Sequence, residues 1–333
     1  MLAVLILAAG KGTRMKSPFP KVLHLLAGEP LLLHVLETAL SLQPERVLVI
    51  VGHKAHLVKE VLSPYAVKTV LQKKQLGTGH AVMMAASDLE DFRGDVLVLC
   101  GDVPLIKPET LKDLLELHRK QQAAVTVLTA KVKKPFGYGR IVRDAEGLVD
   151  YIVEEKDASD AERSIREINT GTYIFQKEFL FEALKEIRPD NVQGEYYLTD
   201  VIGLARKRGL KVAAFCLQDE TEILGVNSQF DLALAEKFFQ QRLKEGFQKQ
   251  GVTFILPEMV YLEKRVQLGP GCVIYPFVSL RGKTVLEEGV TVESHCDLKD
   301  VRVCAGAFIG AGNILAGGVI PPGKRLAPTR VLI

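Results

Sequence analysis

A strict period of six residues near the end of the chain constrains the fold more than any other feature. Every sixth residue from Leu262 is aliphatic, and the residue four positions after each of the first six is small or medium-sized. The aliphatic positions are Leu262, Leu268, Ile274, Leu280, Leu286, Val292 and Leu298, and the smaller ones are Val266, Cys272, Val278, Thr284, Val290 and Cys296. After Leu298 the register slips by one residue and resumes at Val303, Ile309 and Leu315. Such a period is typical of a hexapeptide parallel β-helix, whereas a β-sandwich, the alternative, has no fixed short period.

The repeat predicts a short left-handed β-helix of about three coils. A solenoid this short leaves its ends and flanks exposed to solvent. Packing against the same element of other subunits, as a ring, would bury them. We therefore expect a homo-oligomer held together by the β-helix.

The residues before the repeat alternate short apolar runs with helical patterns. Buried strands are expected at residues 46–51, 67–71 and 95–100, with helices at 56–62, 79–89 and 109–117. This order predicts a parallel sheet covered by helices, with ligands at the carboxyl ends of the strands. Further strands are expected at 125–128, 139–142, 172–175 and 211–215, and helices at 177–187, 198–208 and 228–244. The predicted fold class is therefore α/β: a Rossmann-like mixed-sheet domain over residues 1–228, a connecting helix over 229–250 and the β-helix over 251–333.

Composition excludes several classes of protein. The 333 residues, 47% of them hydrophobic, suffice for two domains with cores, and a net charge of +3 does not indicate a nucleic-acid or membrane partner. The apolar N-terminus lacks a basic flank and a small-residue cleavage site, and no apolar stretch is long enough to span a membrane, so we expect a cytoplasmic protein. Five cysteines without a C-x-x-C pair argue against a disulfide framework or a structural zinc site, and we interpret them as small buried hydrophobes.

A Gly-rich stretch, residues 7–15, follows the first apolar run and continues to Pro20 and Lys21. Glycines let a ligand approach the backbone, and successive N–H groups in such a turn can hold an anion. Lys11, Arg14 and Lys21 add three cations to the same loop. The stretch therefore predicts a phosphate-binding turn, with an ordinary tight turn and solvated lysines as the alternative.

Two familiar nucleotide motifs do not fit this stretch. A dinucleotide fold requires G-x-G-x-x-G and an acidic residue after the second strand, but position 15 is Met and the second strand is followed by Gly52 and His53. A Walker A loop requires G-x-x-x-x-G-K-[ST], which the Gly10–Thr13 segment does not supply.

Other polar residues follow predicted strands. A second Gly-rich turn, residues 72–80, carries Gln72, whose amide could contact one edge of a base. Asp102 follows the strand at 95–100, where a carboxylate could hold Mg²⁺ against a nucleotide. Taken alone, the second turn is interpreted as a turn and helix start, and Asn227 as a helix N-cap. For Asp102 an ordinary turn residue is the alternative to the Mg²⁺ ligand. No histidine has the spacing of a metal ligand, and the sequence shows no Ser/His/Asp or Cys/His arrangement of a nucleophilic enzyme. These absences are compatible with nucleotidyl transfer, because that reaction needs positioning and charge neutralisation rather than a protein nucleophile.

Nine sequence blocks, taken together in this order, identify a family. The first 230 or so positions closely resemble the uridylyltransferase domain of the bacterial bifunctional N-acetylglucosamine-1-phosphate uridyltransferase/glucosamine-1-phosphate acetyltransferase. The blocks are LAAGxGTRM from Leu7, PKVLH from Pro20, QLGTGHA from Gln75, GDVPL from Gly101, GYGRI from Gly137, IVExKDA from Ile152, EINTG from Glu167, GEYYLTD from Gly194 and GVN from Gly225.

The resemblance implies roles for individual residues. It places uridine and phosphates on the backbone and side chains of Leu7, Ala8, Ala9, Gly10, Gly12, Gln72, Gly77 and Thr78. It implies that Arg14 and Lys21 neutralise the triphosphate and that Asp102 and Asn227 bind Mg²⁺. It places the N-acetylglucosamine moiety against Gly139, Glu154, Asn169 and Thr199. Lys11 receives no role.

The reaction that the resemblance implies is in-line attack of N-acetylglucosamine 1-phosphate on the α-phosphorus of UTP, with loss of pyrophosphate. In the bifunctional family the β-helix continues for many more coils, carries the acetyl-CoA site and assembles as a trimer. For this sequence we expect a trimer without acetyltransferase activity. Alternatives are the same chemistry on another sugar 1-phosphate or nucleotide, such as a glucose 1-phosphate thymidylyltransferase, and a nucleotide-sugar-binding regulatory protein without turnover.

Overall fold

A computed structural model describes residues 1–329, and the chain divides into two compact units. The first unit comprises Met1–His24 and Leu31–Asp231, and the second comprises Leu25–Pro30 together with the chain from Leu232 onward. The short segment Leu25–Pro30 therefore belongs to a unit whose other residues are far away in the sequence. Each unit is described by itself.

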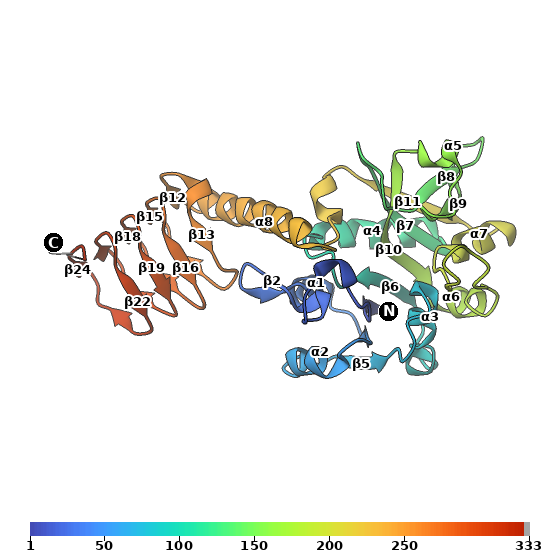
Figure 1. Cartoon of the computed structure of the whole chain (residues 1–333), viewed down its shortest axis with the longest axis horizontal. Coiled ribbons are helices and arrows are strands. Elements are labelled where there is room, and N and C mark those ends of the chain that lie inside the picture. Colours follow the sequence, from blue (N-terminus) through green and yellow to red (C-terminus); the bar gives the residue numbers. More distant parts are fainter. Residues whose placement is uncertain (330–333) are drawn as a thin grey trace. The chain divides into compact units, whose positions relative to one another are not determined.

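The first unit is built on a nine-stranded mixed sheet with the order β11-β7-β10-β6-β1-β4-β5, to which the β8–β9 hairpin is attached through β10 (Figure 1). β1 is parallel to β4 and β6, and β10 lies antiparallel between β6 and β7. The strands are β1 (Leu2–Ala8), β4 (Arg46–Val51), β5 (Lys68–Leu71), β6 (Asp95–Cys100), β7 (Val125–Lys131), β8 (Arg140–Arg143), β9 (Val149–Val153), β10 (Glu167–Gln176) and β11 (Val212–Leu217). The expected Rossmann-like mixed sheet is confirmed.

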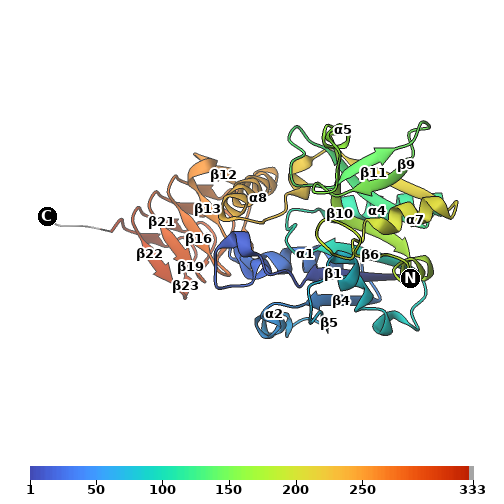
Figure 2. The same ribbon diagram turned by 45° about the vertical axis from the view of Figure 1, so that its right-hand side comes forward.

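Helices cover both faces of this sheet, which explains why its central strands are apolar throughout. In β1, Leu5 packs into the core on one face while Val4 and Ile6 pack into the core on the other. One face is covered by α1 (Leu31–Leu40), α2 (Ala55–Leu62) and α4 (Pro108–Gln121), and the other by α3 (Thr78–Met83), α6 (Lys177–Ala183) and α7 (Asp200–Lys207). Figure 2 shows α1 and α2 beside β1 and β4, and α7 beside β9. The remaining short helices are α5 (Asp160–Arg163) and the 3-10 turns η1 (Thr13–Met15), η2 (Lys21–Leu23), η3 (Ser87–Leu89) and η4 (Glu220–Ile223).

Several expectations about this unit differ from the structure; the helix expected at 177–187, for example, ends at Ala183, and the helix expected at 109–117 continues to Gln121. The helix expected at 79–89 ends at Met83, where Ala85 and Ala86 donate to the carbonyls three residues earlier and the chain tightens towards η3. β10 begins at Glu167 rather than residue 172, because its polar first half reads as loop and a bulge separates Asn169 from Tyr173 in the pairing with β7. β9 was not expected, since its sequence does not alternate cleanly and its pairing with β8 shifts register.

The second unit contains a long helix, a two-stranded hairpin and a left-handed β-helix. α8 (Gln229–Lys249) begins in the last residues of the first unit and lies otherwise in the second. The hairpin consists of β2 (Leu25–Leu26) and β3 (Glu29–Pro30). Ala27 at its tip donates its N–H to Glu236 Oε2 at 2.8 Å and accepts from the N–H of Lys264 at 2.9 Å.

Short strands stack into three parallel ladders in the β-helix, and Figure 1 labels strands of the first two. The first ladder is β12 (Thr253–Phe254), β15 (Val273–Ile274), β18 (Thr291–Val292), β21 (Phe308–Ile309) and β24 (Arg325–Leu326). The second is β13 (Tyr261–Leu262), β16 (Ser279–Arg281), β19 (Asp297–Lys299) and β22 (Ile314–Ala316). The third is β14 (Gln267–Leu268), β17 (Val285–Leu286), β20 (Arg302–Val303) and β23 (Val319–Ile320).

The hexapeptide reading and its register slip are confirmed by the pairing. Leu268 pairs with Leu286, but Leu286 pairs with Val303, so the later coil is one residue shorter. Both periodic sets are buried through most of the repeat, and Leu262, Leu280 and Leu298 are fully buried. The expected count of coils was one too low, since four are complete within the described residues. The first was missed because the 3-10 turn η5 (Pro257–Met259) lengthens one of its corners and breaks the period of six.

Left-handed backbone recurs at the corners of the coils. Gly271, Gly289, Gly306 and Gly323 have φ of 71°, 69°, 66° and 64° at equivalent positions. At a second corner Phe277 and His295 adopt φ of 61° and 62°, and their rings stack with centroids 4.9 Å apart. Each coil therefore turns at positions of left-handed backbone that favour glycine. Where Phe277 and His295 occupy such positions, the backbone is strained.

Two further findings bear on the composition. In the described part of the chain, no helix combines the length and apolar character needed to cross a membrane. All five cysteines are free; Cys272 and Cys296 are buried as interpreted, but Cys100, Cys216 and Cys304 are only partly buried.

Candidate functional site

The Gly-rich opening loop leaves the sheet at the carboxyl end of β1 and folds against Lys21. Gly12 has φ 61°, and a Cβ placed there would lie 2.6 Å from Lys21 Cβ. Only glycine therefore allows the loop to approach Lys21 so closely. Ala8 and Ala9 are buried, whereas Gly10, Lys11 and Arg14 are exposed.

Lys21, Asp102 and Asn227 form one cluster, here called the Lys21 cluster. Lys21 Nζ contacts the carboxylate of Asp102 and donates to Asn227 Oδ1 at 2.9 Å. The N–H of Val226 donates to the carbonyl of Asp102 at 2.8 Å, which holds the two acceptor-bearing segments together. Asp102 follows β6, whose neighbour in the sheet is β1. The cluster therefore lies at the carboxyl ends of these strands, where ligands of α/β sheets bind.

The Lys21 cluster has the donor chemistry of a site for a hard cation. Asp102 supplies a carboxylate and Asn227 a carbonyl oxygen, while Asn227 Nδ2 is directed to the carbonyl of Gly225 at 3.3 Å. The described residues contain no group of three or more His, Cys, Asp or Glu side chains able to hold a metal. Two oxygen ligands from the protein, with phosphates and water supplying the rest, is the arrangement in which Mg²⁺ is commonly held.

A second loop, between β5 and α3, places Gln72, Gly77 and Thr78 together. Gly77 has φ 105°, and a Cβ there would lie 2.5 Å from the carbonyl oxygen of Tyr196. Thr78 Oγ1 accepts from the N–H of Leu198 at 3.1 Å. The loop is therefore held against the segment that precedes α7.

The two Gly-rich loops meet at Gly52. A Cβ on Gly52 would lie 2.7 Å from the carbonyl oxygen of Ala9 and 2.8 Å from Gln75 Nε2. The N–H of His53 donates to the same carbonyl at 3.3 Å. Gly52 thus lets the opening loop and the second loop form adjoining parts of one surface.

Gly139, Glu154, Asn169 and Thr199 form a third group. Thr199 Oγ1 donates to Glu154 Oε1 at 3.1 Å, and the N–H of Asn169 donates to the carbonyl of Gly139 at 2.9 Å. A Cβ on Gly139 would lie 3.2 Å from Ile152 Cγ2 and 3.4 Å from Glu154 Oε2, so the glycine backbone packs closely beside this carboxylate. Burial raises the pKa of Glu154 above its ordinary value, against the opposing effect of the Thr199 hydrogen bond, and nearby Asp200, Asp157 and Glu195 raise it further.

This third group adjoins the other two through neighbouring residues. Thr199 directly follows Leu198, whose backbone N–H donates a hydrogen bond to Thr78 Oγ1 in the second loop. Cys100, two residues before Asp102, directs its Sγ to the carbonyl of Gly171 at 3.6 Å, and Gly171 lies in the same strand as Asn169. The structure therefore brings residues of the opening loop, the Lys21 cluster, the second loop and the third group into one region. Arg14 lies in the opening loop, but no hydrogen bond of its side chain is found within residues 1–329.

The sequence did not single out three residues of this region. Tyr173 is buried and accepts from Asn169 Nδ2 at 2.6 Å, Cys100 contacts Gly171, and His80 is bonded to Gln72. His80 stands in the QLGTGHA block, which was the only available signal for it. Its partner lies eight positions away across a turn, a relation that no strand or helix period predicts.

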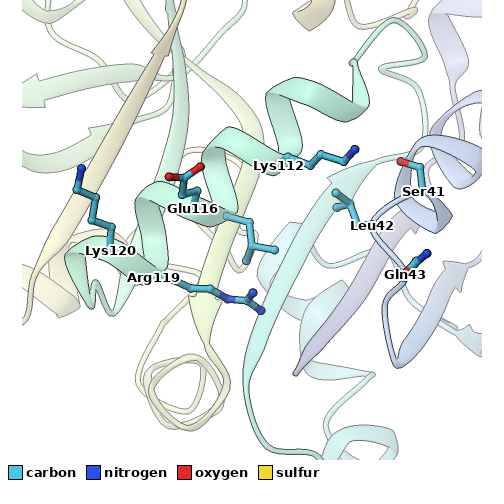
Figure 3. Close-up of a pocket in the computed structure, with 8 residues that line it drawn as sticks. Ser41, Leu42, Gln43, Lys112, Glu116, Arg119 and Lys120 are labelled. Carbon is cyan, nitrogen blue, oxygen red and sulfur yellow. The ribbon is translucent and has the colours of Figure 1, made fainter.

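A separate surface pocket of about 600 Å³ is lined by residues after α1 and by one side of α4. Figure 3 shows Lys112, Glu116, Arg119 and Lys120 along α4, with Lys112 and Arg119 extending towards the side on which Ser41, Leu42 and Gln43 lie. Arg119 also pairs with Asp95, the first residue of β6, at 3.0 Å. This pocket is therefore at the amino end of β6, away from the site, and contains none of the predicted site residues.

Comparisons with known proteins agree with this arrangement. Residues 4–186 match the model of the MobA-like NTP transferase domain. The bifunctional protein GlmU of Streptococcus suis (strain 98HAH33) is 48% identical over 324 residues, which cover 97% of this chain and 70% of that protein. GlmU of Syntrophotalea carbinolica is 46% identical over 95% of this chain and 68% of its own length, and GlmU of Streptococcus gordonii is 50% identical over 97% and 72%.

Among solved structures, a crystal structure of UDP-glucose pyrophosphorylase complexed with UDP-glucose matches with a TM-score of 0.60 at 22% sequence identity. The match covers 72% of this chain and 98% of that one. At this identity the likeness concerns the fold of the nucleotidyltransferase sheet.

Proposed function

The chain belongs to the GlmU family and is a nucleotidyltransferase, and from that premise we propose that it transfers the uridylyl group of UTP to N-acetylglucosamine 1-phosphate with release of pyrophosphate. The observation that carries the proposal is the Lys21 cluster. It unites a cation, a carboxylate and an amide oxygen from three distant segments beside a glycine loop at the carboxyl ends of β1 and β6.

Each group of the site would have a distinct part in this reaction. The opening loop would receive the phosphates of UTP on its backbone N–H groups, while Arg14 and Lys21 would neutralise the charge that develops during transfer. Lys21 Nζ is already directed to this region by Asp102 and Asn227. The second loop would hold the base, with Gln72 facing one of its edges.

The third group would hold the sugar. Glu154 and Asn169 lie beside Gly139 and carry polar oxygens, and Thr199 orients Glu154 by its hydrogen bond. A sugar presents hydroxyl donors that a carboxylate accepts well. Fixing the sugar phosphate in line with the α-phosphorus lowers the barrier chiefly by positioning the reactants.

A divalent cation, Mg²⁺ in this proposal, fits the oxygen donors of Asp102 and Asn227, which accept from Lys21 Nζ in this structure and which Lys21 would release on binding the phosphates. When bound it would neutralise phosphate oxygens and help to orient them. No covalent intermediate with the protein is required, because nucleotidyl transfer can proceed by direct displacement.

The test is pyrophosphate release from a panel of nucleotides and sugar 1-phosphates in the presence of Mg²⁺. We expect UTP with N-acetylglucosamine 1-phosphate to be the preferred pair. Preference for another pair, such as dTTP with glucose 1-phosphate, would replace this substrate assignment by the same chemistry on other substrates. Nucleotide binding without release of pyrophosphate would indicate a regulatory protein.

Three expectations remain predictions with separate tests. A lack of acetyltransferase activity is checked by incubating the chain with acetyl-CoA and glucosamine 1-phosphate. Trimer formation is checked by light scattering, where a monomer at micromolar concentration would contradict it. A cytoplasmic location is checked by fractionating cells that express the chain.

A further inference from the structure

The side-chain amide nitrogen of Gln72, Nε2, is fixed by two hydrogen bonds within the protein. Gln72 is 3% exposed, and its Nε2 lies 3.1 Å from the carbonyl oxygen of Gly77 and 2.9 Å from Nδ1 of His80. A carbonyl oxygen can only accept a hydrogen bond, so the atom facing Gly77 must be the amide nitrogen. The orientation of the Gln72 amide follows from this contact.

The same contact determines the tautomer of His80. Because Nε2 of Gln72 is a donor, Nδ1 of His80 must accept and therefore carries no proton, which leaves the ring proton on Nε2 of the imidazole. Burial lowers the pKa of His80, in keeping with a neutral ring. Both N–H bonds of the Gln72 amide are thus used within the protein.

What remains for a ligand is the carbonyl oxygen of Gln72. In the described residues no hydrogen bond to Gln72 Oε1 is found, while the backbone carbonyl of the same residue accepts from Gln75 Nε2 at 3.0 Å. Gln72 therefore presents an acceptor and no donor. Uracil has an N–H at position 3, whereas cytosine has a bare nitrogen there, so an acceptor at this edge favours uracil.

His80 is itself held in place. It lies in the first turn of α3, where the N–H of Gly79 donates to the carbonyl of Tyr196 at 2.8 Å and Thr78 accepts from Leu198. The imidazole and the Tyr196 ring are 6.3 Å apart between centroids. The backbone that carries the imidazole is therefore tied to a neighbouring segment on both sides.

We propose that His80 is a positioning residue that fixes Gln72 as an acceptor and thereby makes the site prefer a pyrimidine with an N–H at position 3 over one without it. The inference rests on the proposed function, since it assigns Gln72 to the base. Without His80 the amide would keep one anchor, at Gly77, and would leave a buried N–H without a partner, so its carbonyl would be less well oriented.

The experiment compares His80→Leu, which removes the acceptor, with His80→Asn, whose Oδ1 can take the place of Nδ1. For each variant kcat/KM is measured with UTP and with CTP, along with KM for the sugar phosphate. We expect His80→Leu to lower the UTP-to-CTP ratio of kcat/KM about tenfold, with little change in KM for the sugar phosphate, and His80→Asn to keep most of the ratio. If His80 had only a structural role, His80→Leu would lower kcat/KM for UTP and for CTP by the same factor and leave their ratio unchanged.

A double-substitution cycle tests the route through Gln72. In a Gln72→Leu background, His80→Leu should leave the UTP-to-CTP ratio unchanged, because its effect acts through an amide that is no longer present. An unchanged ratio in the single variant His80→Leu, or an equal loss of the ratio in His80→Asn, would overturn the proposal.

Equilibrium binding separates this proposal from the proposed function. If the wild-type chain showed no turnover of UTP with the sugar phosphate, the proposed reaction would fail, yet the binding preference for UTP over CTP and its loss in His80→Leu could still be measured by calorimetry. Equal binding of UTP and CTP by the wild-type chain would overturn the role of His80 whatever the outcome of the activity assay.

Discussion

The two units of this chain place their side chains by opposite means. In the first unit Lys21, Asp102 and Asn227 come from three separate segments of the chain and meet once, in a single cluster. In the second, Leu262, Leu280 and Leu298 occupy one position of successive coils and pair with one another along a ladder. A substitution in the cluster of the first unit should therefore change activity, because each residue there has its own chemical part. A substitution in the repeat should change stability, because each residue there contributes by packing against its neighbours in the ladder. Substitutions in the two units should therefore have separable effects.

The largest expected effect is on catalysis in the first unit. Asp102→Ala removes the carboxylate of the Lys21 cluster, and we expect pyrophosphate release to fall by about 1000-fold or more. The melting temperature should change little, because Asp102 is a partly exposed residue at a strand end. Steady-state assays with UTP, Mg²⁺ and the sugar phosphate measure the loss.

Asp219→Ala is the matched control for Asp102→Ala. Asp219 also pairs with a lysine, Lys107, at 2.7 Å, but it lies outside the Lys21 cluster. Activity within twofold of wild type is expected for this control. Activity within tenfold of wild type in Asp102→Ala would contradict the assigned role of Asp102.

The second prediction concerns packing in the repeat. Leu280 is fully buried in the middle of a ladder, so Leu280→Ala should lower the free energy of unfolding of the second unit by about 2–5 kcal/mol. Leu315 occupies the equivalent position of the last complete coil and is only partly buried, so Leu315→Ala should cost less. Chemical denaturation measures both losses.

Activity provides the comparison between the units for these two variants. At 25 °C, well below unfolding, both should release pyrophosphate at the wild-type rate. Equal losses of stability in the two variants would show that a residue's place in the repeat does not determine its contribution.

The third prediction isolates backbone conformation from packing. Gly289 has φ 69°, and a Cβ there would meet nothing closer than 4.0 Å, so Gly289→Ala adds strain without a clash. We expect a loss of about 1–2 kcal/mol in the free energy of unfolding. Gly246 in α8 has open space and ordinary helical backbone, so Gly246→Ala should stabilise by about 0.5–1 kcal/mol. In thermal denaturation we expect the melting temperature to fall for Gly289→Ala and to rise for Gly246→Ala. Changes of the same sign in the two variants would contradict this account.

The smallest effect is a pH dependence in the first unit. The pKa of Glu154 is raised by burial, so its carboxylate takes up a proton at a higher pH than an exposed glutamate does. Loss of the negative acceptor should weaken sugar binding, and KM for the sugar phosphate should rise by about threefold to tenfold as pH falls through this raised pKa.

Glu154→Gln serves as the reference for this pH dependence, because it cannot titrate. Dividing the wild-type KM profile by that of the variant cancels the titration of the sugar phosphate itself. A ratio that stays constant with pH would show that Glu154 does not contact the sugar.

The sequence predicted those features that depend on neighbouring residues. The apolar runs gave the bounds of β4 and β6, and the slip after Leu298 reappears in the pairing of Leu286 with Val303. The first coil was missed because η5 breaks the period. The period of six residues therefore predicts which side chains are buried only where no insertion interrupts the repeat.

The contacts within the site could not be predicted in the same way. Lys21 and Asn227 are 206 positions apart, and their contact depends on how the sheet is ordered. The place of Lys21 in the opening loop predicted a phosphate contact, but the role of Asn227 as a metal ligand came only from the resemblance to a family. The bond between Gln72 and His80, and the burial that raises the pKa of Glu154, are products of packing that no local pattern contains.

The hairpin Leu25–Pro30 has a consequence for the order of synthesis and for recombination. It leaves the ribosome early, but both backbone groups of Ala27 pair with residues beyond position 231, so these bonds form only after the whole first unit has been made. A single cut after Asp231 would leave the hairpin attached to the wrong fragment. Gene fusion or exchange of the second unit must therefore also replace, or match, six residues near the start of the chain.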